Sequence, residues 1–134
     1  MPNSQSAGEW LTIAKHDLTA AGVLFENDHF TDTIGYMLQQ ALEKMLKSVA
    51  AYHNQRIKRT HDLVELYDIA RGSISLEEAE IEYLESATSY YVENRYPNVY
   101  FTLPTKEEIR QTLDFTTELF ERICNVLQLE PTSL

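Results

Sequence analysis

The sequence has little of several residue types on which other protein classes depend. Of its 134 residues one is cysteine, four are glycine and four are proline. The lone Cys124 excludes an internal disulfide, and its apolar neighbours favour a buried thiol. Folding therefore needs no oxidising compartment. The glycines are scattered, so the sequence contains no glycine-rich phosphate loop.

Long apolar runs and basic residues are also scarce. No run approaches the ~20 residues of a membrane span, and the N-terminal residues lack the basic flank and apolar core of a signal peptide. We therefore expect a cytoplasmic protein without membrane contact. The net charge of −10 excludes nonspecific nucleic-acid binding through a uniformly basic surface. However, five bases lie between positions 44 and 59, and the acids crowd between 77 and 93. A basic corner can bind a phosphate, and an acidic helix can dock a basic partner.

Apolar residues recur at spacings of three and four along most of the chain, which predicts helices, and no segment alternates as a strand does. We expect one domain, residues 1–134, folded as an all-α antiparallel up-and-down bundle of four long helices and one short helix. Trp10, Ile13 and Leu24 are expected in the core, Gly72 to end the short helix with a positive φ, and the tail after Leu129 to fray. The expected helix caps are Ser6 with Glu9, Thr31 or Asp32, Thr60, Ser75 with Glu78, and Thr105 with Glu108.

The expected helix over residues 31–52 is apolar on two sides, which is typical of a central helix. Its polar residues allow two interpretations. Glu43 and Lys47 can form a helical ion pair on a solvated edge. Alternatively, Gln40, Lys44 and Lys47 line one ridge that faces a partner surface or a phosphate.

The residues with chemical potential fall into two groups, and neither predicts a metal or another cofactor. The histidines 16, 29, 53 and 61 lack the spacing of metal ligands. Arg56 and His61 could together handle a phosphodiester, with arginine holding the phosphate and histidine moving a proton. The alternative is a solvated basic loop with His61 at a helix start.

The second group is the aromatic stretch from Tyr90 to Phe101, which surrounds Arg95. Tyrosine and arginine together make an anchor patch for a protein, or a base-stacking platform beside a phosphate clamp. Alternatively, half of the tyrosines belong to the core and Arg95 pairs with a neighbouring carboxylate.

Four segments, in order, resemble the HEPN domain family, in its branch of small stand-alone prokaryotic proteins. They are Trp10-Leu11-x-x-Ala14-x-x-Asp17-Leu18-x-Ala20-Ala21, Gln39-Gln40-Ala41-x-Glu43-Lys44-x-Leu46-Lys47, Thr60-His61-Asp62-Leu63 and Tyr91-Val92-Glu93-Asn94-Arg95-Tyr96-Pro97. The resemblance covers nearly the whole chain.

The resemblance implies a helical bundle that is commonly a homodimer, often paired with a minimal nucleotidyltransferase as a toxin–antitoxin system. Many members are metal-independent ribonucleases that use an arginine followed four to six positions later by a histidine. Arg95 matches that arginine by place, but no histidine follows it and Tyr100 lies in the window.

Three functions follow as expectations. The first is a HEPN module that binds a nucleotidyltransferase partner and a nucleotide or RNA, through Arg95, Lys44, Lys47, Gln40, His61, Tyr91 and Tyr96. The second is a metal-independent ribonuclease toxin that uses Arg95 with a histidine from elsewhere, His61 first, or with Tyr100 as a proton donor. The third is a dimerisation module without a ligand.

Overall fold

A computed structural model describes the backbone of residues 1–95 and 103–134, and the side chains of residues 1–91 and 103–134. These residues form five α-helices and one 3-10 helix, with no strand among them. The helices are α1 (Ser4–Glu26), α2 (Thr31–Tyr52), α3 (Leu63–Ala70), α4 (Glu78–Arg95), α5 (Lys106–Val126) and η1 (Pro131–Ser133). The expected all-α bundle of four long helices and one short helix is confirmed.

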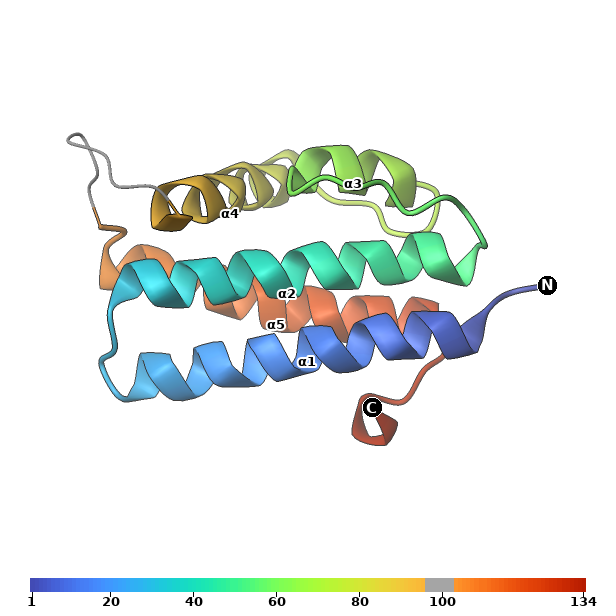
Figure 1. The fold of residues 1–134 in the computed structure, drawn as a ribbon, viewed down its shortest axis with the longest axis horizontal. Coiled ribbons are helices and arrows are strands. Elements are labelled where there is room, and N and C mark those ends of the chain that lie inside the picture. Colours follow the sequence, from blue (N-terminus) through green and yellow to red (C-terminus); the bar gives the residue numbers. More distant parts are fainter. Residues whose placement is uncertain (96–102) are drawn as a thin grey trace.

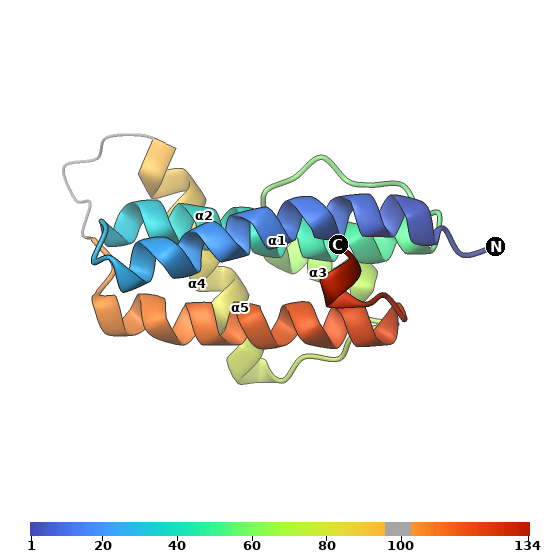
Figure 2. The same ribbon diagram turned by 90° about the horizontal axis from the view of Figure 1, so that it is seen from below.

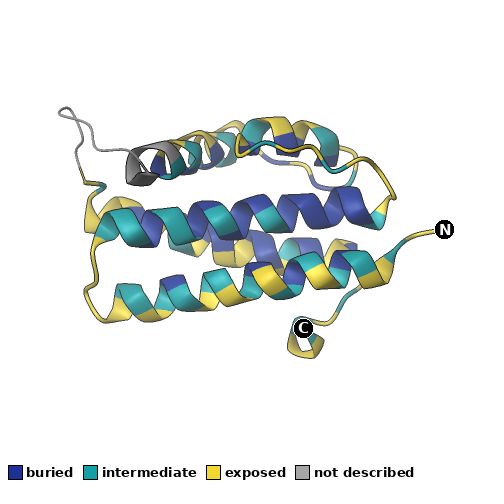
Figure 3. Cartoon of the chain, viewed as in Figure 1, coloured by how far each residue is buried: buried dark blue, intermediate teal, exposed yellow. Residues whose placement is uncertain are grey.

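Helix α2 occupies the centre of the molecule. It runs antiparallel beside α1, with α5 along the far side of this pair and with α3 and α4 on the opposite edge of α2 (Figure 1). Turned by 90°, α4 crosses the other long helices obliquely (Figure 2). Fourteen of the 22 residues of α2 are buried, and the half of the helix toward its C-terminus is almost entirely dark blue in Figure 3. The pattern of two apolar sides thus correctly predicted the central helix.

Small residues bring α1 close to α2. The buried positions of α1 are Ala7, Leu11, Ala14 and Ala21. The expectation for Ile13 is wrong, because its side chain is 45% exposed. Trp10 and Leu24 are only partly buried. Three alanines on the packing face allow a close approach of the two helices, and the larger Trp10 and Ile13 side chains lie beside this face rather than on it.

The helix ends are less predictable than the helices. Thr105 caps α5 as expected, since its Oγ1 accepts from the Glu108 N–H at 3.0 Å. The other expected caps are wrong: Asn3 caps α1, Phe30 precedes α2 without a side-chain bond, and Asp62 caps α3. Helix α4 begins at Glu78, too late for Ser75 to cap it, and the Glu80 side chain accepts from Glu77 N–H instead. Gly72 has no positive φ.

The residues after α5 are held against α1. Lys15 Nζ donates to the carbonyls of Pro131 and Leu134 at 2.8 and 3.4 Å, and these bonds join the η1 segment to α1. The expectation of a frayed tail is therefore wrong. Cys124 is buried as expected, and burial raises the pKa of its thiol to about 11. None of the described helices is both long and apolar enough to span a bilayer.

Candidate functional site

The candidate site is built on a polar stripe of α2 that the fold buries. Gln39, Glu43 and Lys47 are four residues apart, so they lie above one another on one helix face, and they are 0, 5 and 9% exposed. Lys47 Nζ is 3.0 Å from Glu43 Oε2, and Gln39 Nε2 donates to Glu43 Oε1 at 3.1 Å. The predicted Glu43–Lys47 pair is confirmed, but the solvated edge is wrong because the three residues are buried, with His61 and Trp10 of α1 packed against them.

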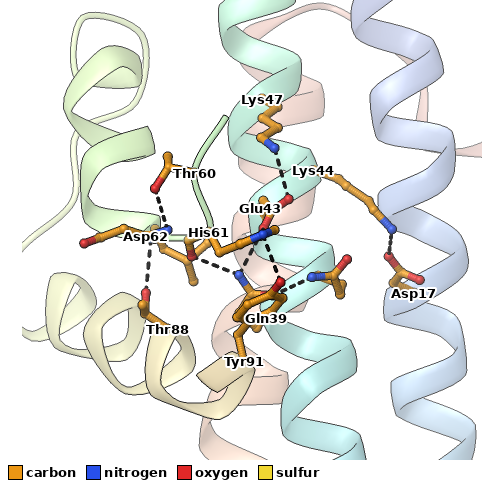
Figure 4. Close-up of polar contacts among 12 residues, drawn as sticks. Asp17, Gln39, Glu43, Lys44, Lys47, Thr60, His61, Asp62, Thr88 and Tyr91 are labelled. Carbon is orange, nitrogen blue, oxygen red and sulfur yellow. Dashed lines mark hydrogen bonds and ion pairs between the residues drawn. The ribbon is translucent and has the colours of Figure 1, made fainter. Parts of the chain in front are cut away.

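His61 joins this stripe from the segment that precedes α3 (Figure 4). Its Nδ1 lies 2.7 Å from Glu43 Oε1, and its backbone carbonyl accepts from Gln39 Nε2 at 3.0 Å. The Asp62 carboxylate caps α3 through Val64 N–H and Glu65 N–H. Asp62 therefore starts α3, and His61, the residue before it, contacts α2.

The surroundings of Glu43 favour its charged form. Burial by itself raises the pKa of this carboxyl, but hydrogen bonds from His61, Lys47 and Gln39 outweigh burial and hold the pKa below its ordinary value. An ionised carboxylate only accepts hydrogen bonds, so the Nδ1 atom of His61 must carry a proton. This fixes the orientation of the imidazole and leaves Nε2 as the ring nitrogen that faces away from α2.

Tyr91 of α4 lies on the far side of His61. Its hydroxyl is 2.9 Å from His61 Nε2, and the two rings stack with centroids 4.0 Å apart. On α2, Tyr36 stacks against Tyr91 at 5.7 Å. The His61 side chain remains 51% exposed. The three rings thus form a partly exposed aromatic row of the kind on which nucleobases stack.

The other predicted binding residues of α2 have different surroundings. Gln40 is partly buried and donates to Gln39 Oε1 at 2.7 Å. Lys44 extends toward α1, away from His61, and pairs with Asp17 at 2.5 Å (Figure 4). Lys47 pairs with Glu43 and lies over the Trp10 ring. Both ammonium groups are therefore neutralised within the fold, and only that of Lys47 lies on the His61 side.

Three predicted residues fall at or beyond the described end of α4. Tyr96 and Tyr100 lie outside the described residues, and so does the side chain of Arg95. The α4 backbone continues to Arg95. Position 95 is one helical turn beyond Tyr91, which places the two positions on the same face of α4.

Sequence reasoning did not select Glu43, Gln39 or Tyr36 as site residues. For the first two a signal existed, since polar residues at three successive i, i+4 positions interrupt a helix that is otherwise apolar on the same side. Tyr36 carried no such signal, because a tyrosine one turn into a helix is ordinary. Among the side chains that the structure describes, no group of three or more potential ligands could hold a metal ion.

Comparison with known proteins identifies the family. The model of the HEPN domain matches residues 7–127, which is nearly the whole chain. The chain belongs to the HEPN family. Two solved structures share the fold: TT1696 from Thermus thermophilus, and ST0689, described as an archaeal HEPN homologue.

Both of these structures align over almost their full length. TT1696 has a TM-score of 0.76 at 22% identity, with 90% of this chain and 97% of that one covered. ST0689 has a TM-score of 0.70 at 18% identity, with 92% and 98% covered. None of the curated proteins matches this chain significantly. At these identities the likeness establishes the fold alone.

Proposed function

We propose that this HEPN protein binds a nucleotide or RNA at the junction of α2, α4 and the segment before α3, as the HEPN component of a pair with a minimal nucleotidyltransferase. The observation that carries the proposal is the position of His61. Glu43 holds its ring at 2.7 Å, the ring is half exposed, and it stacks on Tyr91, one helical turn before Arg95.

Each part of this junction fits a nucleotide chemically. The row of Tyr36, Tyr91 and His61 offers ring faces to a base, and stacking on such faces tolerates any base. An arginine and a histidine supply the hydrogen bonds that a phosphate accepts. A nucleotidyltransferase partner and a toxin–antitoxin role rest on the resemblance to family members, and a homodimer rests on the same ground.

Isothermal titration tests the binding proposal with ATP, a short RNA and the purified nucleotidyltransferase encoded nearest to this gene. We expect binding of at least one nucleotide ligand, and its loss in Arg95→Ala and in His61→Ala. His16→Ala is the matched control, because His16 is exposed on α1, far from the junction along the chain. No heat from any of the three ligands at high concentration would overturn the proposal. Light scattering of the same samples reports whether the chain alone is a dimer.

The orientation of His61 also favours a second candidate, a metal-independent ribonuclease. A carboxylate on Nδ1 is how a general-base histidine is commonly oriented. In this reaction the ribose 2′-hydroxyl would replace the Tyr91 hydroxyl as the hydrogen-bond partner of Nε2. Nε2 would then take the 2′-hydroxyl proton as the 2′-oxygen attacks the adjacent phosphorus. The bond to the 5′-oxygen breaks and that oxygen takes a proton from water, while the resulting hydroxide takes the proton back from Nε2. A 2′,3′-cyclic phosphate, a 5′-hydroxyl and neutral His61 remain. Arg95 would stabilise the extra charge on the phosphate oxygens.

Incubation with a labelled RNA in EDTA tests this candidate. We expect cleavage by the wild-type protein and by His16→Ala, and none by Arg95→Ala or His61→Ala. Intact RNA with the wild-type protein would end the ribonuclease candidate while leaving the binding proposal in place.

A further inference from the structure

Most of the basic side chains that the structure describes have a partner within the fold. Ten of the eleven lysines and arginines have described side chains, and eight of these make an ion pair or a hydrogen bond with another described residue. The two that make none are Arg56 and Arg59, and both are exposed. They lie on residues 53–62, between α2 and α3, which we call the basic loop.

The basic loop is held at both ends. At its start, Gln55 N–H donates to the Ala50 carbonyl at 2.9 Å, and the Asn54 side chain donates to the Met1 carbonyl at 2.6 Å. At its end, the His61 carbonyl accepts from Gln39. Half-buried Ile57 lies between the two arginines. The loop therefore carries its two free guanidinium groups on a backbone that is anchored to the rest of the fold at both ends.

The acidic groups at the end of the loop and next to it in sequence are already engaged. Asp62 caps α3, Glu65 pairs with Lys58 at 3.6 Å, and Asp68 pairs with Arg71 at 2.9 Å. A chain with 21 acids could readily supply carboxylates to Arg56 and Arg59, yet no described side chain does so. These two cations on one loop are therefore available to an external anion, to which their positive charge would attract it.

We infer that the basic loop extends the binding site, so that the ligand is a single-stranded RNA several nucleotides long rather than a mononucleotide. One strand passes from the aromatic row of Tyr36, Tyr91 and His61 along residues 61 to 56, and Arg59 and Arg56 each contact a phosphate. Five residues span at most about 18 Å, a distance that a few nucleotides cover. The inference rests on the proposed binding function and specifies its ligand.

Fluorescence anisotropy with a labelled 2′-O-methyl U12 RNA tests this inference, since the methylated strand keeps its bases and phosphates but cannot undergo attack by its own 2′-oxygen. We expect the wild-type protein to bind U12 much more tightly than it binds ATP or UMP, measured as competitors. In Arg56→Gln/Arg59→Gln, the slope of log K against log salt should become shallower by about 1.4, because each lost contact to single-stranded nucleic acid removes about 0.7.

The matched control is Arg71→Gln/Arg110→Gln, which removes two exposed cations from α5 and the end of α3 and leaves the same net charge. It should keep the wild-type slope. An unchanged slope in Arg56→Gln/Arg59→Gln, or equal affinity of the wild-type protein for UMP and U12, overturns the inference while mononucleotide binding still supports the proposed function. Absence of binding by every nucleotide and RNA overturns both.

Discussion

The Nδ1 atom of His61 lies 2.7 Å from Oε1 of Glu43, a carboxylate that is 5% exposed in the centre of the bundle. This contact joins the segment before α3 to the central helix, and it is the reason that an exposed imidazole has a fixed direction. The same carboxylate neutralises Lys47, whose ammonium group is otherwise shielded from water. Glu43 therefore serves both the stability of the fold and the geometry of the site.

We predict that Glu43→Ala lowers the free energy of unfolding by about 3–5 kcal/mol, because it leaves a nearly buried lysine without a counter-ion. Chemical denaturation followed by circular dichroism measures the change. Glu82→Ala, at an exposed position of α4, is the control and should change stability by less than about 0.5 kcal/mol. Equal effects of the two substitutions would show that the buried Glu43–Lys47 pair stabilises the fold no more than an exposed carboxylate does.

The dependence of the unfolding free energy on pH should reveal the titration of Glu43. Its pKa in the folded protein lies below the ordinary value of 4.5, so the unfolded chain takes up the proton first as the solution is acidified. The stability that Glu43 contributes is then present above about pH 4.5 and is lost as the pH falls through the folded pKa.

Between about pH 6 and about pH 3, the wild-type protein should therefore lose more unfolding free energy than Glu43→Gln does, since glutamine does not titrate. Denaturant curves at four pH values give the comparison. Parallel losses in the two proteins would assign the acid sensitivity to other carboxylates.

Two glycines offer a matched test of the packing between α2 and α4. A Cβ atom at Gly35 would lie 3.0 Å from Cγ and Cδ2 of Tyr90, a buried residue of α4, whereas one at Gly22 meets nothing within 4 Å. Gly35→Ala should destabilise the protein by about 1–3 kcal/mol through overpacking. Gly22→Ala should stabilise it by about 0.5–1 kcal/mol, because alanine favours the helix. Thermal unfolding shows whether each substitution lowers or raises stability. A stabilising Gly35→Ala would contradict the close contact of α2 with Tyr90.

The periodicity of apolar residues predicted the helices and the central place of α2, because burial on two sides requires two apolar stripes. It did not predict the helix ends. Asn3 lies three residues, nearly one helical turn, before the expected cap at Ser6, and Asp62 rather than Thr60 accepts the backbone N–H groups at the start of α3. Many residues in these stretches could cap, and only the packing of the helix selects one.

The site was predictable in part. His61 was selected from the sequence, and so was the Glu43–Lys47 pair, but their contact joins residues 18 positions apart. Spacing rules act within one helix and cannot pair two elements. Lys44 illustrates the same limit, since Asp17, its partner, lies on another helix 27 positions away. The predicted roles of Arg95, Tyr96 and Tyr100 in binding or catalysis remain predictions, because these side chains lie outside the described residues.

The central claim is that RNA binds over the imidazole that Glu43 orients. Histidine side-chain NMR resonances, followed while 2′-O-methyl U12 is added, test it most directly. We predict that the ring resonances of His61 shift with the same dissociation constant as the anisotropy measurement, while those of His16 and His29, both exposed elsewhere, stay in place. Saturating RNA that leaves the His61 resonances unchanged, or that shifts all three histidines alike, would contradict the claim.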